Sequence, residues 1–215
     1  MDISMTADGL SALRGRIKPY LKEKRYQHTL EVEEEAARIG AVYLPAKIGK
    51  LRIAALLHDI TKRASFEKQL QYCEEFGIMV KAQDIFSPKV FHAMTAEALA
   101  RREFADAVDE EILTGIRWHT TGCDQMSLFS AIIYLADYIE PSRTFDDCVA
   151  LREYFWGGMP DAEDTLGQTI HFCKTMVLSF DLTMQNLIKD GETICTDTVL
   201  ARNCFLDRLD SLTQA

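Results

Sequence analysis

Apolar residues recur at three- and four-residue spacing along most of this chain, the pattern of helices that pack on one another. The pattern predicts a helix over residues 25–42, in which the acidic run 31–35 mostly faces solvent. Residues 46–62 predict a second helix after Pro45, and its stretch IAALLHDI is apolar on all sides, as expected inside a bundle. Since no stretch alternates strictly between apolar and polar residues, the predicted fold class is all-α.

Capping signals place the remaining helices. Ser87 with Pro88, Asp109 and Ser127 are typical helix starts, and Gly77 is a typical helix end. No Gly-, Pro- or Ser-rich linker divides the chain, so we expect a single-domain helical bundle over residues 1–215. The further predicted helices cover residues 66–76, 87–104, 109–119, 127–140, 146–156, 161–189 and 199–212.

Composition excludes several classes of partner. The formal net charge is -9, from 24 basic and 33 acidic residues, and no basic stripe offsets it, so no long nucleic acid is expected as a ligand. The N-terminal sequence lacks the apolar core of a signal peptide, and no run approaches a membrane-spanning helix. The six cysteines form no CxxC pair, which favours reduced thiols and a cytoplasmic location with no membrane partner.

Several ionisable side chains lie in strongly apolar surroundings. The doublet His58–Asp59 closes the segment AALLHD, and Asp137 stands within IIYLADYIE. A buried carboxylate is unfavourable unless it is paired, and a metal ion with imidazole co-ligands supplies such a pairing. Any one of these residues alone is more often a hydrogen-bonded core or capping residue. Together, however, they favour ligands that converge from several helices, and the candidate set is His28, His58, Asp59, His92, His119 and Asp137.

Other candidate residues have ordinary explanations. His171 has apolar neighbours, so a place in the core or along a nucleotide is favoured over metal binding. Trp118 and Tyr138 could stack on a base, although packing is the more frequent role of aromatic residues at helical spacing. From the residues alone, Lys62 and Arg143 are equally consistent with solvated charges and with phosphate contacts.

The candidate residues lie in five segments: RYQHTLEV, LRIAALLHDITK, VFHAMTAEA, IRWHTTG and IIYLADYIEPSR. Together these segments resemble the HD superfamily. Within this superfamily, the chain resembles more specifically the YqeK-type symmetrical bis(5′-nucleosyl)-tetraphosphatases, for which HTTG and ADYIEPSR are the discriminating motifs. It extends from about Ile17 to Leu209 and implies an HD metal-binding core over 17–145, with C-terminal helices over 146–212 packed on that core. Ala93 departs from the glycine that such proteins usually carry after the third histidine.

The resemblance implies a metal-dependent hydrolase that splits diadenosine tetraphosphate into two molecules of ADP. It implies a dinuclear metal centre, with iron expected and manganese, cobalt or zinc as alternatives. One metal would be held by His28, His58, Asp59 and Asp137, and the second by His92 and His119, with Asp59 bridging the two. The resemblance assigns catalytic roles to Asp59, Lys62 and Arg143, and substrate contacts to His28, Lys62, His119, Thr120, Thr121, Gly122 and Arg143.

Two rival functions stay open at this point. One is an HD phosphohydrolase that acts on another nucleotide. The other is a module that senses a nucleotide without turnover, although the complete ligand set argues against it because a sensor can lose ligands freely. In each case the partner is a small nucleotide, and a homodimer is compatible with the sequence.

Overall fold

The computed structural model describes residues 7–80, 87–161 and 163–214, which fold into helices with no strand among them. The predicted all-α class is therefore confirmed, while residues 1–6 and 215 of the predicted domain lie outside the described residues. Three short 3-10 turns, η2 (Lys18–Tyr20), η3 (Pro45–Lys47) and η5 (Pro88–Val90), connect longer helices. The α-helices are α1 (Ala7–Ile17), α2 (Glu23–Tyr43), α3 (Ile48–Leu57), α4 (Phe66–Glu75), α5 (Phe91–Glu103), α6 (Glu110–Trp118), α7 (Leu128–Ile139), α8 (Asp146–Gly157), α9 (Thr165–Lys189) and α10 (Thr196–Thr213).

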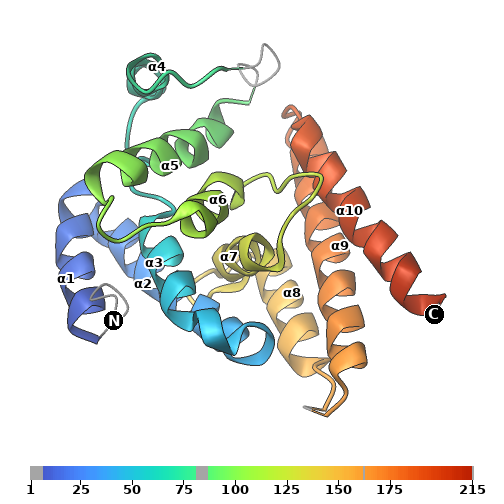
Figure 1. Ribbon diagram of the computed structural model, residues 1–215. Coiled ribbons are helices and arrows are strands. Elements are labelled where there is room, and N and C mark those ends of the chain that lie inside the picture. Colours follow the sequence, from blue (N-terminus) through green and yellow to red (C-terminus); the bar gives the residue numbers. More distant parts are fainter. Residues whose placement is uncertain (1–6, 81–86, 162, 215) are drawn as a thin grey trace.

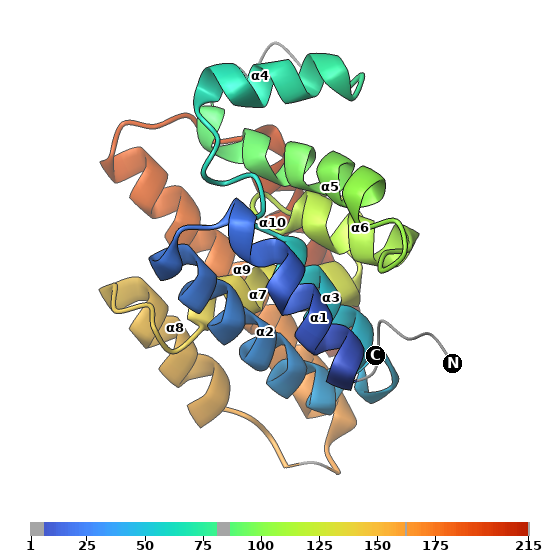
Figure 2. The ribbon, with the colours of Figure 1, turned by 90° about the vertical axis from the view of Figure 1, so that its left-hand side faces the viewer.

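The helices form a bundle around α2, α3, α6 and α7, with α9 and α10 running together along one side (Figure 1). One cluster of buried apolar side chains extends from Ile17 through Leu57 and Ile133 to Phe205. Helix α4 lies at the margin, over α5 (Figure 2), and packs through a separate small cluster that contains Cys73. No helix within the described residues is both long and apolar enough to cross a membrane.

Local signals explain where most helices begin. The side chains of Asp109 and Ser127 accept hydrogen bonds from the backbone amides of Ile112 and Ser130, so they cap α6 and α7 as predicted. Helix α7 is almost wholly buried, which its apolar composition requires. Its last turn leads into Pro141, and this places residues 137–143 beside the core of the bundle.

The predicted helix over 46–62 is wrong at its C-terminal end, because α3 ends at Leu57 and tight turns follow. Tertiary hydrogen bonds replace the helical ladder there. The hydroxyl of Thr61 donates to the carbonyl oxygen of His92 at 2.8 Å, and Gln69 donates to the carbonyl oxygen of Thr61 at 2.7 Å. These bonds hold the segment after α3 against α5 and α4.

The prediction that the acidic run 31–35 mostly faces solvent is also wrong. Glu33 is 1% exposed and Glu35 is 3% exposed. Glu33 accepts hydrogen bonds from the guanidinium groups of Arg14 and Arg52, and Glu35 accepts one from the indole of Trp156. Arg14 lies on α1, a helix that the sequence reading did not predict, so the partners of these carboxylates come from distant segments.

Candidate metal centre

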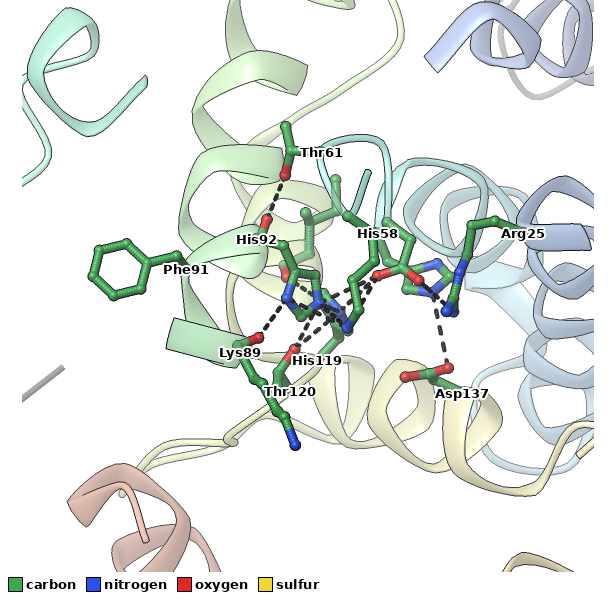
Figure 3. A network of polar contacts seen from close by, with 12 residues as sticks. Arg25, His58, Thr61, Lys89, Phe91, His92, His119, Thr120 and Asp137 are labelled. Atoms are coloured by element: carbon green, nitrogen blue, oxygen red, sulfur yellow. Dashed lines mark hydrogen bonds and ion pairs between the residues drawn. The ribbon is translucent and has the colours of Figure 1, made fainter. Parts of the chain in front are cut away.

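The six predicted ligands lie together at the middle of the bundle, although they come from distant parts of the chain. His28 lies on α2, His58 and Asp59 follow α3, and His92 is the second residue of α5. His119 follows α6 and Asp137 belongs to α7. Figure 3 shows His58, His92, His119 and Asp137 directed toward one another. All six are buried except Asp137, which is partly exposed.

The carboxylate of Asp59 stands between two pairs of histidines. Its Oδ1 atom lies 3.2 Å from Nε2 of His92 and 3.6 Å from Nε2 of His119. Its Oδ2 atom lies 3.5 Å from Nε2 of His58 and 4.0 Å from Nε2 of His28. Each oxygen therefore faces a different pair, an arrangement that suits a carboxylate shared by two cations.

Asp137 completes the side of the cluster that contains His28. Its Oδ1 atom lies 3.0 Å from Nε2 of His28 and 3.9 Å from Nε2 of His58. Two groups of donor atoms each lie within 4.8 Å of one another, which is close enough to surround one metal ion. They are His28, His58 and Asp137, and His58, Asp59 and His119.

Three donor atoms of this cluster are buried without a hydrogen-bond partner: Nε2 of His28, Nε2 of His58 and Oδ1 of Asp59. Orphaned buried polar atoms are rare in folded proteins, because each leaves its desolvation uncompensated. Here the three face one another across a few ångströms. A cation between them would satisfy all three, so the residues present fit a metal centre.

The opposite ring nitrogens of the histidines are already engaged. Nδ1 of His58 lies 2.6 Å from the carbonyl oxygen of Ala55, and Nδ1 of His119 lies 2.7 Å from that of Ile116. A carbonyl oxygen can only accept, so Nδ1 carries a proton in each ring, and Nε2 is the nitrogen that faces Asp59. Nε2 is thereby fixed as the ligand atom, as is typical of metal-binding histidines.

His28 is oriented by a carboxylate that the sequence reading missed. Its Nδ1 lies 3.0 Å from Oε1 of Glu140, which is fully buried. Glu140 also accepts hydrogen bonds from the backbone amide and the hydroxyl of Ser142. Although burial opposes protonation, Asp137 and Glu140 raise the pKa of His28 to about 9.

The remaining ionisation states also suit metal binding. Burial lowers the pKa of His92 to about 4, and the ammonium of Lys62 acts in the same direction. Burial likewise lowers the pKa of His119. Burial alone would raise the pKa of Asp59, but His58 and Lys62 hold it well below its usual range. His92 and His119 are thus neutral imidazoles beside the ionised carboxylate of Asp59, and these are the forms that bind metals.

Three cationic side chains surround the cluster. Nζ of Lys62 lies 2.9 Å from Nε2 of His92, and a guanidinium nitrogen of Arg143 lies 2.6 Å from Oδ1 of Asp137. Arg25 was not predicted, yet it donates to Oδ2 of Asp59 at 2.9 Å. Arg25 precedes His28 by three positions on α2, so both side chains project from one helix face.

Within the predicted HTTG segment, Thr120 contacts the cluster, whereas Thr121 and Gly122 contact other parts of the fold. Oγ1 of Thr120 lies 3.1 Å from Nε2 of His92 and 3.0 Å from Nε2 of His119, so the structure brings this hydroxyl to the cluster. Thr121 instead donates to the carbonyl oxygen of Gly122. Gly122 lies against α9 and α10, and its contact with a substrate stays a prediction.

His171 lies apart from the metal centre, as the sequence suggested. It is buried on α9, its Nε2 lies 2.9 Å from the carbonyl oxygen of Phe155, and its ring stacks on Tyr154. The hydrogen bond and the stacking account for its burial without a metal.

Comparison with known proteins agrees with this geometry. A family model described as HD domain matches residues 25–142, which is more than half of the chain and includes all six predicted ligands. This chain belongs to the HD domain family.

Named relatives within this HD domain family cover most of the chain. It is 33% identical over 192 residues to a protein of Halalkalibacterium halodurans named symmetrical bis(5′-nucleosyl)-tetraphosphatase, covering 88% of this chain and 93% of that one. A Bacillus subtilis protein of the same name is 34% identical, with 87% and 92% covered.

A solved structure shows the same fold. The crystal structure of a predicted HD superfamily hydrolase involved in NAD metabolism, from Clostridium acetobutylicum, superposes with a TM-score of 0.78. The two sequences are 33% identical, and the match covers 92% of this chain and 97% of the other. The likeness therefore includes the C-terminal helices as well as the HD domain.

A cavity of about 630 Å³ opens beside the HD-domain cluster. Lys62, His119, Thr120, Asp137 and Arg143 line it on the side of the cluster. The opposite wall comes from the start of α8 and the end of α9. Pockets of 300–1,000 Å³ are typical of small-molecule sites, so this cavity has room for a nucleotide next to the predicted ligands.

Proposed function

We propose that this protein is a metal-dependent hydrolase that cleaves diadenosine tetraphosphate symmetrically into two molecules of ADP. The observation that carries the proposal is the set of orphaned donor atoms around Asp59, beside a cavity lined by Lys62 and Arg143. Relatives that match over most of the chain, at 33% and 34% identity, bear the name of this activity.

In this proposal His28, His58, Asp59 and Asp137 hold one metal, and His92 and His119 hold a second one that shares Asp59. The positions of the two oxygens of Asp59 support the sharing. An imidazole-rich set suits iron, manganese, cobalt or zinc better than magnesium, and we infer iron as the resident metal. When bound, such metals lower the pKa of water and polarise phosphoryl oxygens.

Arg143 is placed to bind phosphate. One of its terminal nitrogens is engaged by Asp137, while its Nε is buried without a hydrogen-bond partner. The carboxylate of Asp137 raises the pKa of Arg143 further, so the guanidinium keeps its charge. Arginine donors match phosphate oxygens well, and Arg143 lines the cavity.

In the proposed reaction, Lys62 and Arg143 stabilise negative charge. Water attacks a phosphorus atom, the phosphoanhydride bond breaks, and negative charge develops on the departing ADP. Lys62 lies on the side of His92, and Arg143 lies on the side of Asp137. Their positive charges stabilise this developing charge. No covalent nucleophile is required.

The products test the proposal directly. Diadenosine tetraphosphate should yield only ADP, and hydrolysis in ¹⁸O-labelled water should place one label in one ADP of each pair. Appearance of AMP and ATP would show asymmetric attack and overturn the symmetrical assignment. Cleavage of a different phosphate ester alone would leave an HD phosphohydrolase with another substrate, and binding without turnover would indicate a nucleotide sensor.

Arg143→Ala tests the phosphate contact. We expect this variant to keep its metals but to lose about 2–4 kcal/mol of transition-state stabilisation, the effect of removing one oxyanion donor. Arg202→Ala is the matched control, because Arg202 is equally exposed and also pairs with an aspartate at 2.6 Å, but on the α9–α10 side and outside the cavity. Equal kcat/KM values for the two variants would contradict the assignment.

We also propose that the protein works in the cytoplasm. No disulfide joins its six cysteines, which all lie within the described residues, and four of them are buried, which supports a reducing compartment.

A further inference from the structure

A second cavity meets the first one next to the metal centre. It measures about 440 Å³ and lies between the start of α5, the HTTG segment and the loop that joins α9 to α10. The two cavities share the lining residues Lys89, Thr120, Thr183, Leu187 and Glu192. The two cavities are therefore adjacent, and these shared side chains form the boundary between them.

Thr120 marks this boundary at the metal centre. Its hydroxyl contacts both His92 and His119, and its side chain lines both cavities. In Figure 3, Lys89 and Thr120 lie next to His92 and His119, whereas Asp137 lies on the side of His58 and Arg25. Because the first cavity also contacts His119 and Asp137, an elongated ligand that lies along the metal centre in that cavity can extend past Thr120 into the second one.

The first cavity combines phosphate-binding and base-binding features. Arg143 lines this cavity near the metal centre. Phe145, two positions later in the sequence, also lines the cavity, and 68% of its surface is exposed. An aromatic side chain on the wall of a nucleotide-sized cavity offers a face on which a base can stack. Asp147 accepts hydrogen bonds from Tyr138 and Asn186, so its carboxylate is held in place as an acceptor for ribose or amino groups.

The second cavity suits a nucleoside better than a phosphate chain. Its only two charged side chains among the described lining residues, Lys89 and Glu192, form an ion pair at 2.5 Å. The rest of the wall is neutral, with apolar Val90 and Leu187 beside several threonines. Such a wall can cover a base and offer hydroxyl groups to a ribose, but it leaves no unpaired cation for phosphate.

We propose that the two cavities hold the two nucleosides of one substrate, with Phe145 stacking on the base in the first cavity. This rests on the proposed function and assigns the substrate class as dinucleoside polyphosphates. The phosphate chain then spans the metal centre between the nucleosides, so the bond at its middle lies nearest the ligands. A mononucleotide would fill one cavity and leave the other empty.

ADP, the product, is the probe for both subsites, because each half of the substrate leaves as ADP. Calorimetric titration of the metal-loaded protein should show two ADP bound per chain. Phe145→Ala should weaken one of the two about tenfold, within the range for loss of a stacking aromatic, and Phe145→Trp should restore it. Ile188→Ala is the matched control, since Ile188 is also 68% exposed but lines neither cavity.

Thr193→Trp tests the second cavity. Thr193 lines that cavity with an exposed side chain, so a tryptophan there should fill the space and leave one ADP per chain. Thr196→Trp, an exposed position outside both cavities, should leave two. A single ADP in the wild type, or no effect of Phe145→Ala and Thr193→Trp, would overturn the two-subsite proposal. Two ADP bound without cleavage of diadenosine tetraphosphate would instead refute the proposed function alone.

Discussion

Asp59 is the residue on which the arrangement of the centre depends, because its two oxygens face different histidine pairs. Its neighbour His58 offers a single ligand atom, Nε2, because its Nδ1 is engaged by the carbonyl oxygen of Ala55. Substitution of Asp59 should therefore disturb the metal centre more than substitution of His58, although the two residues are adjacent in the sequence.

Asp59→Ala should lose both metals and essentially all turnover. His92→Ala should spare the metal held on the side of His28, because His92 contacts the other oxygen of Asp59. Metal analysis of the purified variants, with activity measured in parallel, distinguishes the two. If the Asp59→Ala protein kept two metals per chain, the bridging role would be misassigned.

Glu35 supplies a prediction about pH and stability. Burial raises the pKa of Glu35, although the hydrogen bond from Trp156 opposes the rise. The unfolded chain then releases this proton at lower pH than the folded chain, so the free energy of unfolding falls as pH rises between the two pKa values. Glu35→Gln keeps an acceptor for Trp156 and removes the titration. We expect it to raise the free energy of unfolding by about 1 kcal/mol at pH 8, a typical change for one buried polar group.

The gain from Glu35→Gln should vanish on acidification to about pH 4, where the wild-type carboxyl is also protonated. Glu34→Gln is the control with the opposite sign, since Arg52 lowers the pKa of Glu34 and the charged form is the stabilised one. Urea unfolding at several pH values measures both variants. A pH-independent effect of Glu35→Gln would contradict the buried, titrating carboxyl.

The sequence identified the six converging side chains partly because His58, Asp59 and Asp137 are ionisable groups among apolar neighbours, a signal visible locally. The five segments that resemble the HD superfamily contributed the rest of the evidence. Arg25 and Glu140 gave no such signal. Arg25 stands in the charged stretch KEKRYQH, and its partner Asp59 is 34 positions away. Glu140 has the place of an ordinary helix end before a proline, and its partner His28 is 112 positions away. Their roles depend on contacts that only the fold creates.

At the scale of the elements, helix boundaries that local contacts fix were predicted correctly, whereas a boundary that tertiary contacts fix was not. The starts of α6 and α7 were predictable because Asp109 and Ser127 cap them through bonds to residues three positions along. The end of α3 was not predictable, because hydrogen bonds to α5 and α4 fix the following turns. Burial of Glu33 likewise depends on α1, whose apolar positions are too few to stand out.

Gly122 joins the metal centre to the C-terminal helices and can be tested as a packing position. Its φ is +67°, and a Cβ there would lie 2.5 Å from that of Ala201 and 2.9 Å from the ring of Phe180. Gly122→Ala should therefore add a steric clash to backbone strain and destabilise the fold by about 2 kcal/mol or more. Gly77→Ala is the control, since Gly77 has a φ of +65° and no neighbour near its Cβ position. Equal losses of thermal stability in the two variants would exclude a packing role.

At the scale of the whole molecule, the C-terminal helices contribute to the same core as the metal-binding helices. Met176 and Phe180 of α9 and Phe205 of α10 belong to the apolar cluster that contains Ile133 of α7. The end of α9 also lines both cavities. We therefore propose that residues 146–212 fold together with the 17–145 core as one domain, and that the substrate cavities exist only in the assembled bundle.

Metal content should consequently control the stability of the entire fold. The ligands come from five separated segments, so an unfolded chain has no preformed centre and a metal binds mainly the folded protein. We expect protein purified without chelators to carry up to two transition-metal ions per chain, iron foremost. Removing them should lower Tm, because the orphaned atoms of His28, His58 and Asp59 lose their compensation.

Restoring the metal should reverse this loss by mass action, with about 2.7 kcal/mol gained at a free-metal concentration one hundred times Kd. Scanning calorimetry with iron, manganese, cobalt, zinc and magnesium compares the candidates on equal terms. The Asp59→Ala variant is the control, since its Tm should respond to none of them. If magnesium alone stabilised the protein and supported full activity, and no transition metal were found, the imidazole-rich cluster would have another role. A single cooperative transition that shifts as a whole would show that the centre holds the HD core and the C-terminal helices together.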